Sequence, residues 1–239
     1  MQRPKPATNE IYHIYNRGVE KRNVFVSDGD RLRFIHDLFE FNDVAPAENT
    51  YYRSPQSYEV GLRKIVLRRS GRRNPRKLLV EILAFCLMPN HFHLMVRQKI
   101  DNGITEFMRK LGTGYTNYFN QKNERSGALF QGKYKIAHVA TEAHFIHLPY
   151  YIHLNPLDLA APGWREKKLR NFKKLLGFLE SYRWSSHLDY AGKKNFPSVT
   201  QRESLMEFFG SPIGYKKTIA EWLENLDLGL GEIREITLE

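Results

Sequence analysis

Hydrophobic and polar positions in the first 155 residues follow the two periods that distinguish strands from helices. Residues 10–17 (EIYHIYNR) combine aromatic and β-branched side chains, as strands do. Residues 28–41 repeat apolar positions near helical spacing behind Asp28, a residue that can cap a helix. The apolar run 78–87 (LLVEILAFCL) predicts a buried strand, and a Met-Pro-Asn turn leads into a second strand at 91–97 (HFHLMVR).

The pattern then repeats its order with a longer helix. Residues 102–123 carry an apolar stripe at helical spacing, residues 133–140 read as a strand, and Thr141 can cap a further helix that runs to Asn155. The order β-α-β-β-α-β plus one helix predicts an α+β fold: a ferredoxin-like split βαβ core, with an antiparallel sheet and two helices on one face.

The chain divides into a predicted core and an extension. Residues 1–160 hold the core, with a basic insertion at 45–77, and residues 161–239 form a mainly helical C-terminal extension. With 41% apolar residues among 239, the chain can bury a real core, which excludes wholesale disorder. No apolar run reaches the about 18 residues of a membrane span.

The cysteine content and the first residues predict a compartment. Cys86 is the single cysteine, which excludes an internal disulfide and a cysteine metal site. The polar first residues are unlike a secretory leader. We therefore expect a cytoplasmic protein without membrane association.

The charge balance points to a polyanionic partner. Lys and Arg number 37 against 26 Asp and Glu, which gives a net charge of +11, and nucleic acid is the commonest polyanion in a cell. The bases predicted to contact phosphates lie in 62–77, which contains no acid, and beside the GALFQG motif; they are Arg63, Lys64, Arg68, Arg69, Arg72, Arg73, Arg76, Lys77, Arg125, Lys133 and Lys135. Alternatively, each of these side chains is an ordinary solvated base on the protein surface.

Two histidines in the strand 91–97 form a candidate metal site. Residues two apart on a strand point to the same side, so His91 and His93 project together while Phe92 enters the opposite layer. Two adjacent imidazoles can share a divalent cation, although such pairs also arise by chance. No Asp or Glu lies near them in sequence, which argues against a two-metal nuclease built on carboxylates.

The segment YYIHLNP at 150–156 offers complementary chemistry. Tyr151 and Asn155 are four residues apart on a predicted helix and share one face. The amide oxygen of Asn155 is a hard ligand suited to Mg²⁺ or Mn²⁺. The phenol of Tyr151 can attack a phosphorus atom whose oxygens a cation polarises.

Five segments, in order and in register, resemble the single-tyrosine branch of the HUH single-strand transposases, particularly the REP-associated tyrosine transposases. They are YNRG at 15–18, MPNHFHLMV at 88–96, YTNYFN at 115–120, GALFQGKYK at 127–135 and YIHLNP at 151–156. The resemblance covers roughly residues 8–190. It implies a DNA nicking and joining enzyme in which His91, His93 and Asn155 hold the metal and Tyr151 is the nucleophile.

The resemblance also implies a substrate and a mechanism. The substrate is single-stranded or hairpin DNA, cut through a 5′-phosphotyrosine intermediate during DNA transposition. We therefore expect the protein to be associated with the nucleoid, and the resemblance favours a monomer over a homodimer. The chain has no P-loop, consistent with strand joining that needs no nucleotide hydrolysis.

Alternative readings stay open. Pro149 lies two residues before Tyr151 and could spoil its geometry, which would leave a domesticated, catalytically silent binder of structured nucleic acid. Water could replace Tyr151 in a metal-dependent nuclease, and RNA could be the ligand. Tyr115 and Tyr118 are rival nucleophiles, but their place on an apolar stripe favours core packing.

Overall fold

An antiparallel sheet is the centre of the molecule. The computed structural model describes residues 5–46, 75–166 and 171–237. Within them, the sheet has four strands in the order β2-β3-β1-β4, and each neighbouring pair is antiparallel. The strands are β1 (Ile11–Arg17), β2 (Val80–Met88), β3 (His91–Gln98) and β4 (Lys135–His138). The predicted α+β class with an antiparallel sheet is confirmed.

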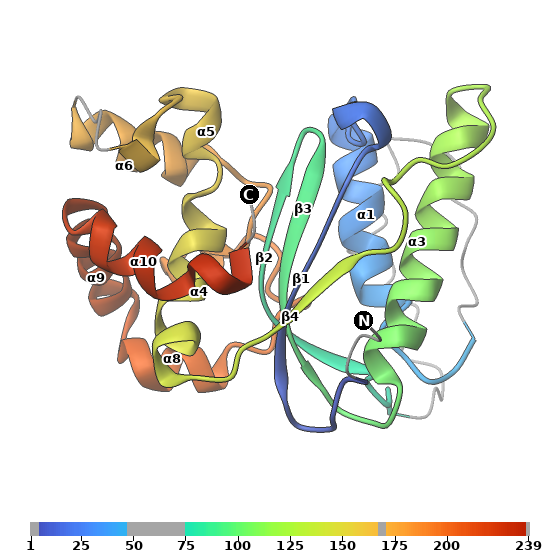
Figure 1. Ribbon diagram of the computed structural model, residues 1–239, viewed down its shortest axis with the longest axis horizontal. Coiled ribbons are helices and arrows are strands. Elements are labelled where there is room, and N and C mark those ends of the chain that lie inside the picture. The colour runs from blue at the N-terminus through green and yellow to red at the C-terminus, as the bar shows by residue number, and fades with distance from the viewer. Residues whose placement is uncertain (1–4, 47–74, 167–170, 238–239) are drawn as a thin grey trace.

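Helices cover both faces of the sheet (Figure 1). On one face lie α1 (Asp28–Glu40) and α3 (Gly103–Lys122), and on the other lies α4 (Glu142–Leu154) with the helices that follow it. Those later helices are α5 (Leu157–Ala160), α6 (Phe172–Ser181), α7 (His187–Tyr190), α8 (Glu203–Phe209), α9 (Pro212–Glu224) and α10 (Leu226–Thr237). Two 3-10 turns complete the described structure, η1 (Val19–Lys21) and η2 (Trp164–Glu166). No described helix combines the length and the apolar character needed to cross a membrane.

The first helix begins with a capping box. Ser27 has extended backbone angles, its Oγ accepts a hydrogen bond from the Asp30 amide at 3.3 Å, and the Asp30 carboxylate accepts one from the Ser27 amide at 2.8 Å. This reciprocal pair satisfies two donors that a helix start otherwise leaves without partners. The prediction that Asp28 caps the helix is therefore wrong by one residue.

The last strand is shorter than predicted. Pairing of β4 with β1 runs from Lys135 opposite Tyr15 to His138 opposite Tyr12, so β4 covers 135–138 and not 133–140. Before it, the chain bonds to the end of β1 outside the ladder, where the Gln131 amide donates to the Arg17 carbonyl at 2.8 Å and Phe130 forms an isolated bridge with Gly18. The four-residue edge leaves part of β1 without a strand neighbour on that side.

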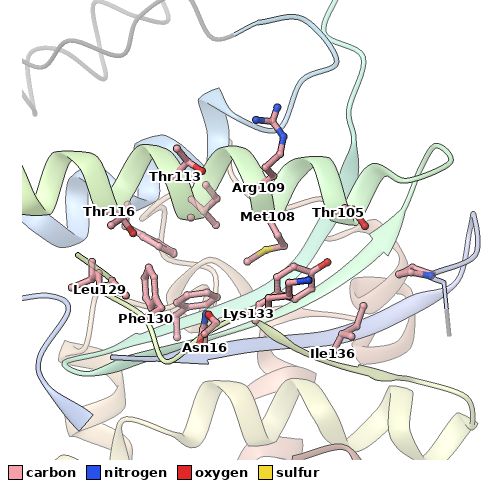
Figure 2. Close-up of a pocket in the computed structure, with 18 of the residues that line it drawn as sticks. Asn16, Thr105, Met108, Arg109, Thr113, Thr116, Leu129, Phe130, Lys133 and Ile136 are labelled. Carbon is pink, nitrogen blue, oxygen red and sulfur yellow. The ribbon is translucent and has the colours of Figure 1, made fainter. Parts of the chain in front are cut away.

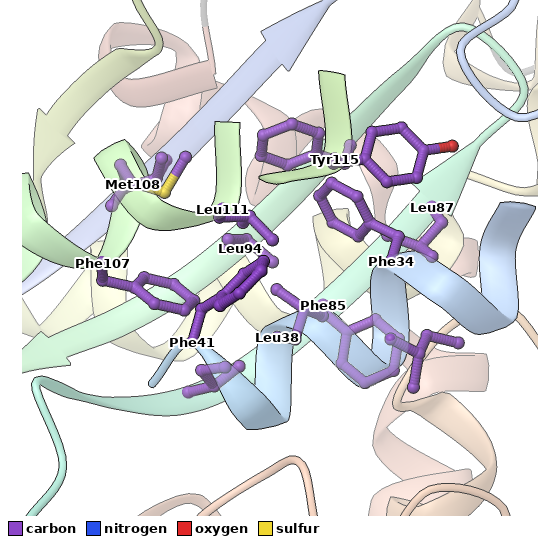
Figure 3. Packing of buried hydrophobic residues seen from close by; sticks show 14 of the residues in the cluster. Phe34, Leu38, Phe41, Phe85, Leu87, Leu94, Phe107, Met108, Leu111 and Tyr115 are labelled. Carbon is purple, nitrogen blue, oxygen red and sulfur yellow. The ribbon is translucent and has the colours of Figure 1, made fainter. Parts of the chain in front are cut away.

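Side chains along β3 alternate between two hydrophobic clusters. Phe92, Leu94 and Val96 join the cluster under α1 and α3, and Met95 joins the cluster on the α4 face. Figure 3 shows Leu94, Phe34 and Tyr115 together in the first cluster. Because β3 has β2 and β1 on either side and helices over both faces, its register is fixed by packing.

The C-terminal residues share the second cluster with the sheet. The segment after α6 runs beside the outer edge of β2, where the Leu87 amide donates to the Trp184 carbonyl at 2.9 Å and the Ser186 amide donates to the Phe85 carbonyl at 3.0 Å. The shared cluster contains sheet residues and later residues together: Cys86, Met95, Trp164, Tyr215, Trp222 and Ile233. The domain boundary at residue 160 stays a prediction.

Replacing Phe92 tests whether side chains along β3 alternate as described, with Phe92 in the core and its neighbours His91 and His93 on the other face. Phe92 is 2% exposed, and its ring centre lies 5.0 Å from that of Phe34. Phe92→Ala should lower the free energy of unfolding by about 3–5 kcal/mol through the cavity it leaves, and Phe92→Leu should cost less. Urea unfolding followed by circular dichroism measures both. A loss below about 1 kcal/mol for the alanine variant would mean that Phe92 does not face the core.

Candidate active site

The strand β3 brings His91 and His93 together on the face of the sheet that α4 covers. Their ring centres are 5.0 Å apart and the rings are nearly perpendicular, at 89°. His91 is 9% exposed and His93 is 1% exposed. The two imidazoles therefore lie side by side in a mostly buried position, as the two-residue spacing predicts.

Hydrogen bonds occupy the Nδ1 atom of each ring. His91 Nδ1 lies 2.6 Å from the Asn90 side-chain oxygen, and His93 Nδ1 lies 2.9 Å from His13 Nε2. An amide oxygen only accepts, so His91 donates through Nδ1 and keeps a lone pair on Nε2. A neighbouring group that holds one ring nitrogen in this way is typical of metal-binding histidines.

The environment keeps His93 neutral. Burial lowers the pKa of His93 well below its ordinary value, as would a proton on the neighbouring His13, and the positive charges of Arg165 and Arg17 lower it further. A metal ligand must be an unprotonated imidazole. His93 therefore has the protonation state that metal binding needs.

Tyr151 lies directly against this pair. Its ring centre is 5.5 Å from that of His93, edge to face at 88°, and 6.1 Å from that of His13. Tyr151 is only 2% exposed. A phosphate cannot reach the phenol oxygen in this conformation, so attack requires a movement that uncovers it.

Asn155 follows α4 as its C-cap. Its Nδ2 donates to the Tyr151 carbonyl at 2.8 Å, and its Oδ1 accepts from the Arg165 guanidinium at 3.3 Å. The same guanidinium lies 5.5 Å from the centre of the Tyr151 ring. Pro149 lies inside α4, yet the helical hydrogen bond from the Asn155 amide to the Tyr151 carbonyl forms after it, at 3.2 Å.

A small cavity opens beside the histidines, on the α4 face at the end of β1. Its volume is about 120 Å³, and its lining residues are Tyr15, Asn16, Arg17, His91, His93, Gln131 and Lys135. Two bases and two imidazoles thus surround a space that suits a phosphate group with a bound cation. Tyr151 and Asn155 are not among the residues that line it.

The side chains fit a divalent cation in part. Within residues 5–46, 75–166 and 171–237, no three His, Cys, Asp or Glu side chains are grouped so that they could hold a metal ion. The Nε2 atoms of His91 and His93 can supply two ligands. Any others would be neutral oxygens, such as the Asn155 amide, water or the phosphate itself, which suit Mg²⁺ and Mn²⁺.

Comparison with known proteins identifies the central part of the chain. Residues 62–155 match the family model described as "Transposase IS200 like". Over these residues the chain is similar to IS200-like transposases. The matched residues include His91, His93, Tyr151 and Asn155, and the match confirms the predicted family resemblance.

Other comparisons are more distant. A solved structure described as a REP-associated tyrosine transposase bound to a REP hairpin is similar to this chain with a TM-score of 0.47 and 12% identity, over 84% of this chain and 90% of that one. No protein of curated function matches the chain.

A larger groove lies on the opposite face of the sheet, between α3 and the strands β1 and β4 (Figure 2). Its volume is about 710 Å³. Phe92, Leu129 and Phe130 contribute apolar surface, and Lys133 contributes a charge. Asn16 lines both this groove and the histidine cavity, so both spaces border the end of β1.

Two of the bases predicted to bind DNA hold the fold in place. Arg76 donates to the carbonyls of Phe39 and Asn42 and lies 3.9 Å over the Phe39 ring, which fixes the end of α1. Arg125 donates to the Asn120 side chain at 2.7 Å. Both side chains thus have partners within the protein, and DNA contact by them stays a prediction.

The remaining predicted bases fall into two groups. Lys77, Lys133 and Lys135 are exposed, and the last lines the histidine cavity. Outside the described residues lie Arg63, Lys64, Arg68, Arg69, Arg72 and Arg73. DNA contact by all of these bases stays a prediction.

The rival nucleophiles have structural contacts. The Tyr115 hydroxyl donates to the Val24 carbonyl at 2.5 Å, and the Tyr118 hydroxyl donates to the Asp30 carboxylate at 3.1 Å. Burial raises the pKa of both phenols, which disfavours the phenolate that attacks phosphorus. The predicted packing role of both tyrosines agrees with these contacts.

Two residues of this site are absent from the sequence-based predictions. His13 alternates with Tyr15 along a predicted strand, which places both on one face, but pairing of β1 with β3 is needed to bring His13 to His93. Arg165 lies in the C-terminal extension, and its spacing from Tyr151 carries no signal. Both contacts depend on the tertiary fold.

Buried histidines on the far side of α4 predict a pH-dependent stability. Burial lowers the pKa of His187 to about 4 from its ordinary 6.5, against a smaller opposing effect of Glu180. Below pH 6.5 the unfolded chain takes up a proton that folded His187 refuses, so stability is lost as the pH falls from 6.5 to 4. The loss from this one group should reach roughly 3 kcal/mol at the acid end.

Urea unfolding of the wild type and of His187→Gln at several pH values checks this. The wild type should lose more stability on acidification than the variant, in which glutamine cannot titrate. Equal pH dependence in the two proteins would contradict a lowered His187 pKa.

Proposed function

We propose that this protein nicks and rejoins single-stranded DNA in a metal-dependent reaction, with Tyr151 as the nucleophile, as a transposase does. The observation that carries the proposal is the contact of Tyr151 with His93, whose ring lies beside that of His91. The β-α-β-β-α-β order with sheet order β2-β3-β1-β4 supports the predicted split βαβ, ferredoxin-like core.

Each proposed metal ligand has a distinct origin. His91 and His93 would bind Mg²⁺ or Mn²⁺ through Nε2, because their Nδ1 atoms are held by Asn90 and His13. Asn155 would contribute its amide oxygen from the end of α4. When bound, the cation would draw charge from a non-bridging oxygen of the scissile phosphate.

The reaction forms one bond and breaks one. The Tyr151 oxygen bonds to phosphorus and loses its proton to solvent. The bond from phosphorus to the 3′ oxygen of the preceding nucleotide breaks, and that oxygen takes up a proton from solvent and leaves as a 3′-OH. Attack by another 3′-OH on the 5′-phosphotyrosine reverses these steps and joins two strands without nucleotide hydrolysis.

The basic side chains suggest a path for the DNA. Arg17 and Lys135 line the histidine cavity, Lys133 lines the groove on the opposite face, and Asn16 borders both. A single strand could pass around the short edge strand β4, with bases against apolar groove residues and phosphates near these charges. Hairpin DNA as substrate, a monomeric state and association with the nucleoid belong to the same proposal.

The burial of Tyr151 favours a second candidate function. A phenol that is 2% exposed and absent from the cavity lining suits a catalytically silent binder of structured nucleic acid. The same burial is also compatible with a hydrolytic nuclease, in which water bound near His91 and His93 attacks the phosphorus in place of Tyr151.

A covalent trapping experiment separates these functions. End-labelled single-stranded hairpin DNA and Mn²⁺ are mixed with the wild type, with Tyr151→Phe and with Tyr150→Phe, and the products are run on a denaturing gel. Tyr150 is the matched control, because it neighbours Tyr151 but packs against Phe209 and Trp222. We expect a protein-linked 3′-side fragment in the wild type and in Tyr150→Phe, and none in Tyr151→Phe.

The other outcomes assign the other functions. Cleavage without any linked fragment, retained in Tyr151→Phe, would support water as the nucleophile. Binding of the hairpin without cleavage by any variant would support the silent binder and refute the proposed chemistry.

Salt dependence of DNA binding tests the proposed path. Lys133→Ala and Lys135→Ala should each weaken binding of a labelled oligonucleotide and reduce the slope of log affinity against log salt by roughly 0.7, the value for one lost single-strand phosphate contact. Lys173→Ala on α6 is the control, because this exposed lysine lies outside both the groove and the cavity. Fluorescence anisotropy at several salt concentrations gives the slopes, and equal slopes for all variants would refute the path.

A further inference from the structure

A buried histidine on a neighbouring strand connects the histidine pair to the last helix. His13 lies on β1 and is fully buried, at 0% exposure. Its Nδ1 lies 2.7 Å from the Ile236 carbonyl oxygen, and its Nε2 lies 2.9 Å from His93 Nδ1. We call this chain of Ile236 carbonyl, His13 and His93 the imidazole relay.

The hydrogen bond between His13 and the Ile236 carbonyl determines which atom donates in the bond between His13 and His93. A carbonyl oxygen only accepts, so His13 must carry its hydrogen on Nδ1. A neutral imidazole has one N–H, so His13 Nε2 is an acceptor and His93 Nδ1 donates to it. The lone pair of His93 then lies on Nε2.

The opposite direction is costly here. For His93 Nδ1 to accept, both His13 nitrogens would need hydrogens, which makes His13 a fully buried cation. Arg17 lines the same cavity as His93, and Arg165 lies over the Tyr151 ring that packs against His93, so positive charge is already close. A buried charge without a counter-ion is strongly disfavoured.

The relay is held at both ends by packing. Ile233 and Ile236 of α10 are 0% and 4% exposed in the cluster that also contains Tyr151 and Met95. The His13 ring stacks on that of His93 at 5.1 Å and meets the edge of Tyr151 at 6.1 Å. One residue therefore contacts the proposed ligand, the proposed nucleophile and the C-terminal helix.

We propose that His13 is a positioning residue. Its bond to the α10 backbone fixes which of its nitrogens carries hydrogen, and this makes His93 donate through Nδ1. His93 Nε2 then has the lone pair that can bind the metal. This inference rests on the proposed function, because it takes His93 to be a ligand. It gives residues 226–237 a part in metal binding, although they lie far along the chain from the histidines.

Metal binding in the absence of DNA tests the relay. Titration calorimetry with MnCl₂ alone is carried out on the full chain and on His13→Phe, which keeps a ring but loses both nitrogens. We expect an affinity loss of about 10- to 100-fold, as for other residues that hold a metal ligand. His13→Gln should recover most of the affinity, since its amide can donate to Ile236 and accept from His93.

Two further variants separate the possible failures. His138→Phe is the matched control, a histidine on β4 that pairs with Glu10 and is 44% exposed, and it should bind Mn²⁺ as the wild type does. His93→Ala should lose the metal. If His93→Ala loses it but His13→Phe binds normally, the relay is overturned and the proposed function stands. If His93→Ala binds as the wild type does, the proposed metal site is wrong.

The nitrogen spectrum of the wild type provides a readout that needs no variant. In protein with ¹⁵N-labelled histidine, the relay predicts hydrogen on Nδ1 and none on Nε2 for both His13 and His93 in the metal-free state. A hydrogen on His93 Nε2 would overturn the relay, even if His13→Phe fails to fold.

Discussion

The alternation of side chains along β3 is the constraint on which the rest of the structure depends. Phe92, Leu94 and Val96 point into the core under α1 and α3, so His91 and His93 must point to the other face. A slip of one residue would exchange the two sets, burying imidazoles among aromatic rings. The same apolar packing that stabilises the sheet therefore also places the histidine pair.

That placement creates a second requirement, because imidazoles buried at this depth need hydrogen-bond partners. His91 finds one locally in Asn90 of the turn, while His93 finds one in His13 across the β1–β3 ladder. Satisfying these Nδ1 atoms leaves Nε2 as the position from which each ring can bind a cation. The hydrogen bonds to these two Nδ1 atoms therefore stabilise the fold and also orient the rings for the proposed metal binding.

The helix α4 lies between the candidate site and the C-terminal residues, and it contacts the site with one side and those residues with the other. Tyr151 faces His93, while Tyr150 packs on Phe209 and Trp222. His153 lies between the hydroxyls of Ser186 and Tyr215 at 2.7 and 2.8 Å, and His147 accepts from the Trp222 indole at 2.9 Å. Residues after 160 therefore pack against the same helix that carries Tyr151, in one cluster with the sheet.

The sequence by itself determined the features that follow from local periodicity. Strand and helix order, the shared side of His91 and His93, and the spacing of Tyr151 from Asn155 could all be read from periods of two and 3.6 residues. The predictions that were wrong concern element ends, at the Ser27 cap and at the short β4.

Only the tertiary structure decided the long-range contacts. The bond from His13 to His93 spans 80 residues and that from His13 to Ile236 spans 223. Contacts of this separation depend on how the β1 ladder and the C-terminal helices pack, and no local pattern encodes them. The burial of Tyr151 and the placement of Arg165 against it were decided in the same way.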